Sequence, residues 1–389
     1  MITKLHIENF KSLADFDLPP DGLRLGKFTC LVGLNGSGKS TLLQAFDFIA
    51  HLVTGEMEGW LGQREWKRTE LTTQLGGKRS PVIFFRVIMD DETEGDLIWE
   101  GRFNTTQLRC TYEQIRKGGH DILLELNDAK LFMAGGNGTA DPKPEPLNFV
   151  YSGSVLSTVA LSKAAPGIAR VKSILKSLKS LELLSPQLMR RRARKAEDIG
   201  AGGEKLSAFL GTFKPEQRRQ LLDTLKEYYP SLKDWTVKSL AFGWKNLRVT
   251  ESYGDKLVLD ATHMNDGLLR IMAILAQAQS AHSFLLFDEI ENGINPELVE
   301  KLVGFLIGLD RQVIVTTHSP MILNYIPDEV ARQAVMLLYK PRDGKTRCVR
   351  FFDLPQTNAK LRALGPGEVF VDTKLAELVA QLPLHSSMP

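Results

Sequence analysis

The feature that most constrains this chain is a glycine-rich octapeptide, GLNGSGKS, at residues 33–40. It fits the pattern GxxxxGK[ST], in which glycines let consecutive backbone N–H groups converge on phosphate oxygens. An apolar run at 28–32 precedes it, and apolar residues at helical spacing follow from Lys39, so the loop joins a strand to a helix. That helix points its positive end at a bound anion. The residues expected to hold the phosphates are Gly33, Asn35, Gly36, Ser37, Gly38, Lys39, Ser40 and Thr41.

Two adjacent carboxylates end a second apolar strand. Residues 284–287 are FLLF, and Asp288 and Glu289 follow directly. A strand that is apolar along its whole length is typical of a sheet buried on both faces, and ligands bind at the carboxyl edge of such sheets. We expect Asp288 and the Ser40 hydroxyl to orient Mg²⁺, and Glu289 to polarise an attacking water. Lys39 is expected to reach the β and γ phosphates.

Two further segments place polar residues at the ends of elements. His318 follows the apolar strand at 313–317, downstream of the paired carboxylates, and is a candidate γ-phosphate sensor. Asn265, Asp266 and Gly267 open a helix. Asn and Asp are favoured at helix N-caps, so the residues alone favour an ordinary cap and a functional contact equally.

Composition is informative mainly by what it excludes. The 389 residues carry a net charge of only +3, so any surface that binds nucleic acid must be local. The N-terminus has no apolar signal region, and no apolar run is long enough to cross a bilayer. Three widely separated cysteines without a CxxC pair favour a reducing compartment. We therefore expect a cytoplasmic protein that does not insert into a membrane.

The remaining pattern predicts a mixed α/β chain. Residues 2–10 and 28–32 are expected as strands, 81–126 as antiparallel strands, 153–230 as mostly helical and 236–260 again as strands. Residues 134–147 are rich in glycine and proline and are expected as a loop. We divide the chain into an N-terminal lobe at 1–133, a mostly helical insertion at 134–235 and a C-terminal lobe at 236–389.

In this order and spacing, the motifs resemble those of ABC-type ATPases of the SMC, RecF-like and OLD groups. LHIENFKS resembles their first strand, VGLNGSGKSTLL their Walker A loop, LLFDEIENGINP their Walker B strand with the D-loop, and TTHSP their switch-histidine loop. MNDGLLR resembles their signature helix. The resemblance implies an ABC/SMC-like P-loop ATPase head that has a mixed sheet, an antiparallel β lobe and a helical insertion, and that uses ATP and Mg²⁺.

The resemblance also implies a site split between two copies. In this class the Walker A loop of one subunit faces the signature helix of the other, so Asn265, Asp266 and Gly267 would act in trans across an ATP-dependent dimer. Two residues depart from the family pattern. Asn265 stands where the family usually has Ser, and Asn295 stands where close relatives often have His. The Q-loop glutamine could be Gln63 or Gln74.

Three functions fit this resemblance. We favour an ATPase in DNA repair or phage defence that regulates a separate effector protein; the alternatives are a transporter's nucleotide-binding subunit and a switch with little turnover. Arg190, Arg191 and Arg192 are the candidate DNA contact, with a solvated helix face as the alternative interpretation. The acidic residues after His318, such as Asp353, Glu368 and Asp372, are scattered. We therefore expect no nuclease activity.

Overall fold

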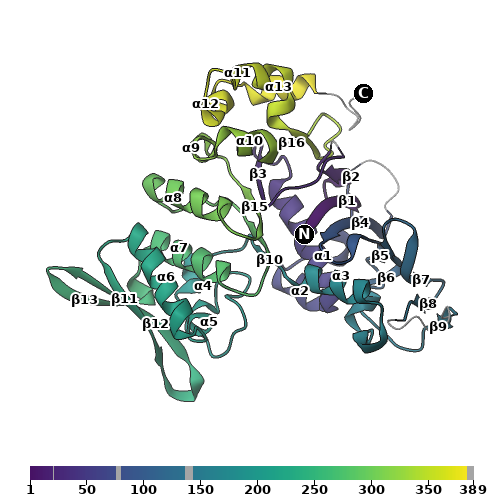
Figure 1. Cartoon of the computed structure of the whole chain (residues 1–389), viewed down its shortest axis with the longest axis horizontal. Helices are drawn as coiled ribbons and strands as arrows, with labels where there is room; N and C mark the ends of the chain where they lie inside the picture. The colour runs from purple at the N-terminus through teal and green to yellow at the C-terminus, as the bar shows by residue number, and fades with distance from the viewer. Residues whose placement is uncertain (21, 76–79, 136–142, 383–389) are drawn as a thin grey trace.

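A six-stranded sheet forms the centre of the protein (Figure 1). The computed structural model describes residues 1–20, 22–75, 80–135 and 143–382. In sheet order the strands are β10 (Leu178–Leu181), β14 (Phe284–Phe287), β15 (Gln312–Thr316), β3 (Phe28–Val32), β16 (Val335–Tyr339) and β17 (Arg347–Arg350). The first five run parallel and β17 is antiparallel, so the carboxyl ends of β10, β14, β15 and β3 meet at one edge.

Both faces of this sheet are buried because its strands are apolar throughout. Leu31 and Ile314 pack into one hydrophobic core, while Cys30 and Val313, their neighbours in sequence, pack into a second core on the other face. The first core contains α1 and the second contains α7 and α8. These helices are α1 (Lys39–Thr54), α7 (Asp266–Ala278) and α8 (Pro296–Ile307).

An antiparallel sheet covers α1 on the side away from the central sheet. Its order is β2 (Leu13–Leu18), β1 (Ile2–Phe10), β4 (Val82–Asp91), β5 (Gly95–Asn104), β6 (Arg109–Lys117), β7 (Asp121–Asn127), β8 (Lys130–Met133) and β9 (Glu145–Pro146). Alternate residues point inward, and Phe48 of α1 packs against Phe10 and Phe103 at ring distances of 5.3 and 5.2 Å. The antiparallel strands expected within 81–126 are confirmed. Part of the expected loop, 136–142, lies outside the described residues.

The segment expected to be mostly helical is more varied. Its helices are η2 (Val155–Ser157), η3 (Leu161–Lys163), α3 (Pro166–Lys176), α4 (Pro186–Met189), α5 (Leu206–Leu210) and α6 (Pro215–Tyr228). Strand β10 lies between α3 and α4 and forms the edge of the central sheet. The sequence pattern failed there because LKSL is short and half polar. The three-part division of the chain remains a proposal.

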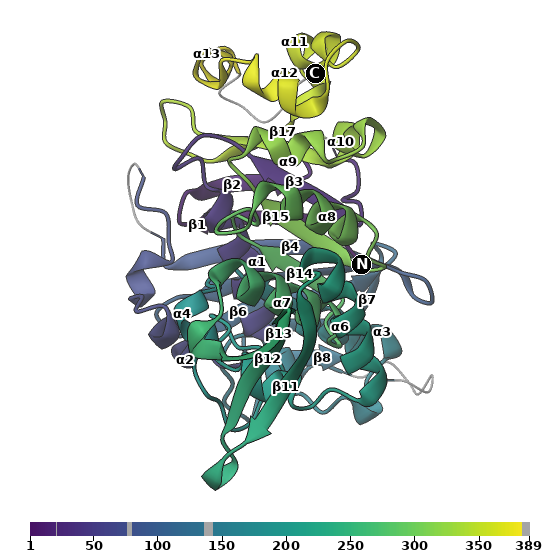
Figure 2. The same cartoon turned by 90° about the vertical axis from the view of Figure 1, so that its left-hand side faces the viewer.

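A third, three-stranded sheet projects away from the body of the molecule (Figures 1 and 2). It consists of β11 (Leu232–Ser239), β12 (Lys245–Tyr253) and β13 (Asp255–Asp260), with η4 (Ala241–Gly243) in the first turn and η5 (Ala261–His263) after β13. One face is buried through Trp235, Leu247 and Val249, which belong to the core that also holds α7. The strands expected at 236–260 are thus confirmed.

The C-terminal helices pack beside the end of the central sheet. They are α9 (Pro320–Asn324), α10 (Asp328–Ala334), η6 (Phe351–Asp353), α11 (Pro355–Lys360), α12 (Pro366–Val371) and α13 (Leu375–Gln381). Leu378 of α13 is buried in the core, so this helix packs internally. Glu368 caps the Gly365 N–H at 3.0 Å and Asp372 pairs with Lys360 at 2.9 Å. Across the described ranges, none of the helices has the length and apolar character that a bilayer crossing requires.

Candidate functional site

The glycine-rich loop follows β3 and leads into α1, as expected. At Gly33, with φ of 149°, an added Cβ would lie 2.2 Å from the Leu338 carbonyl oxygen. At Gly38, with φ of 108°, it would lie 2.3 Å from the Thr346 Oγ1. Only glycine fits these two positions, because β16 and the loop before β17 hold the turn closely from outside. Contacts with Leu338 and Thr346 therefore fix the position of this loop.

Two side chains of this loop, Lys39 and Ser37, have no hydrogen-bond partner outside the loop among the residues that the structure describes. The Lys39 Nζ donates to the carbonyl oxygens of Gly33 at 2.9 Å and Leu34 at 3.3 Å. Burial lowers the pKa of Lys39, against the opposing effect of Asp288 and Glu289. The Ser37 Oγ is buried and, among the described residues, has no hydrogen-bond partner. A cation and an unpaired hydroxyl in a glycine cradle fit a phosphate group.

The Walker A and Walker B residues meet at the carboxyl edge of the central sheet. The Ser40 Oγ donates to the Asp288 Oδ2 at 2.8 Å, across 248 residues of sequence. The Thr316 hydroxyl donates to the other carboxylate oxygen, Oδ1. A hydroxyl and a fixed carboxylate at this distance are the ligand types that Mg²⁺ prefers, so the two residues fit the metal that the sequence predicts.

Glu289 has a strained backbone beside this pair. Its φ is 45°, a left-handed value that glutamate rarely adopts, and its N–H donates to the Thr316 Oγ1 at 2.9 Å. The Glu289 Oε1 lies 3.6 Å from the His318 Nε2, and the two side chains are 47% and 36% exposed. The expected base and the expected sensor are therefore neighbours in a position that solvent reaches.

Sequence reasoning missed two residues that hold this arrangement. Thr316 is fully buried and contacts both Asp288 and Glu289. Glu291 accepts hydrogen bonds from the Thr317 Oγ1 at 2.8 Å and the His318 N–H at 3.0 Å, and so joins the loops that follow β14 and β15. Both lie within the DEIE and TTHSP segments, where hydroxyl and carboxylate residues flank the predicted ones. Their position beside the predicted residues was the sequence signal that could have identified Thr316 and Glu291.

A third missed residue, Glu182, follows β10. Because Leu181 pairs with Phe287 in the sheet, the next residues, Glu182 and Asp288, lie at the same edge. The Glu182 side chain is only 4% exposed and forms an ion pair with Arg64, which also binds Asp47 of α1 at 2.6 Å. Burial raises the pKa of Glu182 to about 7, although Arg64 opposes this shift.

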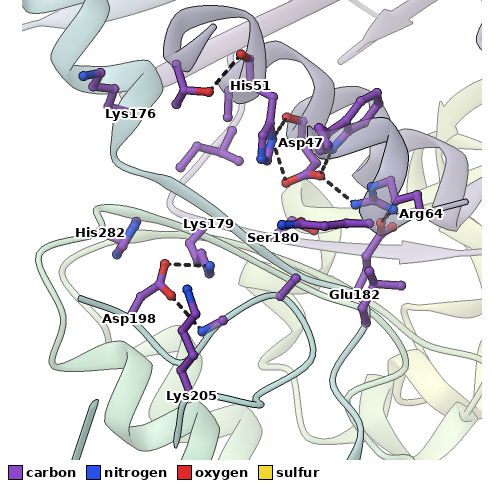
Figure 3. A pocket seen from close by; sticks show the side chains of 18 of the residues that line it. Asp47, His51, Arg64, Lys176, Lys179, Ser180, Glu182, Asp198, Lys205 and His282 are labelled. Atoms are coloured by element: carbon purple, nitrogen blue, oxygen red, sulfur yellow. Dashed lines mark hydrogen bonds and ion pairs between the residues drawn. The ribbon is translucent and has the colours of Figure 1, made fainter. Parts of the chain in front are cut away.

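Glu182, Arg64 and Asp47 line part of a polar cavity of about 250 Å³ between α1, β10 and the loop at 198–205 (Figure 3). Its ionic groups largely pair with one another, as in the Lys179–Asp198 contact at 2.7 Å. Gln63 lines this cavity. Gln74 does not line it, and its side-chain amide donates to the carbonyl oxygens of Thr69 and Thr72. Neither contact assigns a Q-loop, so that residue stays unplaced.

The signature segment begins α7. The Asn265 Oδ1 accepts a hydrogen bond from the Leu268 N–H at 2.7 Å, which is the N-cap geometry. Asn265 and Asp266 are exposed, and no hydrogen bond of the described residues joins them to the loop at 33–40. At Gly267 an added Cβ would lie 3.0 Å from the Gly293 carbonyl oxygen, so this glycine packs against the D-loop of its own chain.

The arginine run follows α4 instead of forming a helix face. The Arg190 guanidinium donates to the Met264 carbonyl oxygen at 2.8 Å and to Asp266 at 2.5 Å. It is therefore engaged at the start of α7. Arg191 and Arg192 are exposed. Of the three residues of the predicted DNA contact, Arg190 is thus bound within the protein, whereas Arg191 and Arg192 are exposed.

Two solved structures share this fold. A head domain of SMC bound to the C-winged helix domain of ScpA aligns with a TM-score of 0.51 at 17% identity, covering 90% of this chain and 96% of that chain. An SMC head with an extended coiled coil, bound to the C-terminal domain of ScpA derived from Pyrococcus furiosus, aligns with a TM-score of 0.53 at 14% identity, covering 90% and 95%. At these identities the likeness concerns the fold alone.

Sequence comparison identifies the family. The OLD nuclease of Thermus scotoductus is 24% identical over 364 residues, which are 89% of this chain and 63% of that protein's length. Residues 180–324 match the family model described as "AAA domain, putative AbiEii toxin, Type IV TA system". Residues 1–234 match the model of the AAA ATPase domain. Since that match covers more than half of the chain, the protein belongs to the AAA ATPase domain family, and it is similar in sequence to an OLD nuclease and in fold to SMC heads.

Proposed function

We propose that this chain binds ATP with Mg²⁺ and hydrolyses it at the edge formed by β3, β14 and β15. The observation that carries the proposal is the 2.8 Å hydrogen bond between Ser40 and Asp288, because it joins the phosphate-binding loop to the acidic strand end. Mg²⁺ held there would neutralise charge on the phosphates. Ser40 and Asp288 are the residues that would hold it.

The other residues of the site have separate roles in this proposal. Lys39 turns from the loop carbonyl oxygens to the β and γ phosphates, and the loop N–H groups donate to the same oxygens. Glu289 accepts a proton from water, and Thr316 keeps that carboxylate in place through the backbone N–H. His318, next to Glu289, contacts the γ-phosphate side of the site.

The test measures phosphate release and nucleotide binding separately. We expect Lys39→Ala to lose both, and Glu289→Gln to bind ATP while turnover falls by about 10²–10⁴-fold, as for loss of a general base. Lys27→Ala is the matched control, because Lys27 lies next to β3 and pairs on the surface with Asp310. Wild-type turnover in Glu289→Gln would contradict the assignment.

We also propose that ATP brings two copies together through the start of α7. The support is that Asn265 and Asp266 are exposed and, among the described residues, have no hydrogen bond to the loop at 33–40. Gly267→Asp is a poor test because a side chain at 267 meets Gly293 in the same chain. Asn265→Asp is sharper. Asp caps a helix as well as Asn does but would repel a partner's γ-phosphate.

The dimer is measured by light scattering with ATP in the Glu289→Gln background. We expect Asn265→Asp to remain monomeric under conditions in which Asn265→Ser, carrying the family's usual residue, still associates. A mass that ATP leaves unchanged in the parent protein, or an Asn265→Asp protein that dimerises normally, would contradict the split site.

The proposed cellular role is in DNA repair or phage defence, with the ATP cycle regulating a separate effector protein. The support is similarity to a relative named OLD nuclease and to two SMC heads, each bound to a domain of ScpA. ATPase rates measured with and without single- and double-stranded DNA test this role. A rate that neither form changes would favour a role away from DNA.

A further inference from the structure

The turn between β11 and β12 contains a strained aromatic residue that the fold does not bury. Phe242 and Gly243 have φ of 58° and 77°, and the Trp244 N–H donates to the Ala241 carbonyl oxygen at 3.4 Å. Two successive positive φ values are typical of a type I′ hairpin turn, which prefers Asn before Gly. Phenylalanine is unfavourable in that position, and the Phe242 residue is 87% exposed. The strain is therefore not offset by packing within the chain.

The fold places the basic segment beside this turn. Ala193 and Lys245 exchange two backbone hydrogen bonds, of 3.3 and 2.7 Å. The Arg194 guanidinium stacks over the Trp244 ring at 4.5 Å. The arginine run contains no aromatic residue of its own, but the β11–β12 turn supplies two next to it.

This surface carries a net positive charge, since its exposed cations outnumber the exposed carboxylate of Glu197. Within the described part of the chain, none of its five exposed cations forms an ion pair with a carboxylate. Of the two acidic residues that follow the run, Asp198 is paired with Lys179 and Glu197 is exposed. The cations are Arg191, Arg192, Arg194, Lys195 and Lys238.

We propose that the Phe242 turn and these cations form a binding surface for single-stranded nucleic acid. A base stacks on the Phe242 ring, and the backbone phosphates lie along the basic segment. A duplex fits less well, because its bases are already stacked and cannot reach the ring. The inference deepens the proposed association with DNA. It rests on that role and not on ATP hydrolysis.

The test is fluorescence anisotropy with a labelled oligothymidine of about 20 nucleotides and a duplex of equal length, over a series of salt concentrations. We expect Phe242→Asn to weaken binding of the single strand about tenfold, since stacking on one aromatic residue contributes on this scale. The salt dependence should stay as in the wild type. Arg192→Glu with Arg194→Glu should weaken binding and make the salt dependence shallower.

The controls separate this site from the nucleotide site and from misfolding. Asn suits a left-handed turn, so Phe242→Asn should fold and keep the basal ATPase rate. Val371→Ala changes an equally isolated apolar side chain, 69% exposed on α12, and should bind like the wild type. Unchanged affinity in Phe242→Asn would show that the ring does not contact the nucleic acid and would overturn the proposal. So would a wild-type protein that binds no single strand at low salt.

Discussion

Several residues of this protein adopt a backbone that glycine normally supplies, and two of them, Glu289 and Phe242, do so in very different surroundings. Glu289, with φ of 45°, lies at the edge of the central sheet, where Thr316 binds both its N–H and the neighbouring Asp288. Phe242, with φ of 58°, lies at the end of a projecting hairpin and is 87% exposed. The buried Thr316 holds the first residue, whereas among the described residues the hydrogen bonds of its own turn hold the second. Strain therefore persists for different reasons in the two regions.

The contrast predicts that the proposed ATP hydrolysis at the edge of the central sheet depends on residues that do not contact the substrate. Thr316→Val preserves shape but removes the hydroxyl that orients Asp288 and Glu289. Loss of such a supporting partner typically lowers activity by about 10–100-fold. We expect kcat for ATP hydrolysis to fall within that range while ATP affinity, which we assign to Lys39 in the proposed function, changes little.

The matched control is Thr3→Val, which removes a buried strand hydroxyl bound to the Ile88 carbonyl oxygen at 3.1 Å, in the antiparallel sheet. It should lower stability slightly and leave kcat unchanged. If both variants lost turnover equally, loss of any buried hydroxyl would lower activity. Thr316 would then have no special role in orienting Asp288 and Glu289.

A second prediction concerns buried charge at the same edge. Burial raises the pKa of Glu182 from 4.5 to about 7. Between these values the folded protein keeps a proton that the unfolded chain has released, so stability falls as pH rises through this window and then stays level. Glu182→Gln lacks this titration. Relative to that variant, the wild type should lose about 3 kcal/mol of unfolding free energy between pH 4.5 and 8.

Urea unfolding of both proteins at several pH values measures this difference. Other titrating groups, such as the buried Glu113, are present in both proteins and cancel. A difference that stays constant across pH would show that the Arg64 ion pair, and not burial, determines the state of Glu182.

The sequence predicted some strands of the fold and missed one. Long apolar or alternating runs, such as 28–32 and 81–126, predicted their strands correctly because the local pattern matches the final burial. Strand β10 was missed because its four residues acquire strand structure only by pairing with β14. The same cause concealed Glu182, whose position beside Asp288 follows from sheet register and not from any motif.

At the site, motifs placed the reactive side chains, but not the residues that position them. Lys39, Ser40 and Asp288 could be named because the chemistry fixes their spacing from a strand or a loop. Thr316 and Glu291 could not, since many residues can supply a supporting hydrogen bond. The stacking of Arg194 on Trp244 could not be predicted either, because it depends on backbone pairing between Ala193 and Lys245, which are far apart in the sequence.

The smallest expected effect tests the hairpin directly. Phe242→Asn should stabilise the β11–β12 turn by about 1 kcal/mol, the lower end of the strain of a bulky residue in a left-handed conformation. Hydrogen exchange at the amides of Leu240 and Trp244, which close the turn, should slow about fivefold. Leu108 is the informative counterpart, because its φ is 51° but only 4% of the residue is exposed. There Asn relieves the same strain but removes a buried side chain, so Leu108→Asn should destabilise the protein. If Phe242→Asn destabilised the turn as well, the ring would have a structural contact, and its exposure would no longer require a ligand.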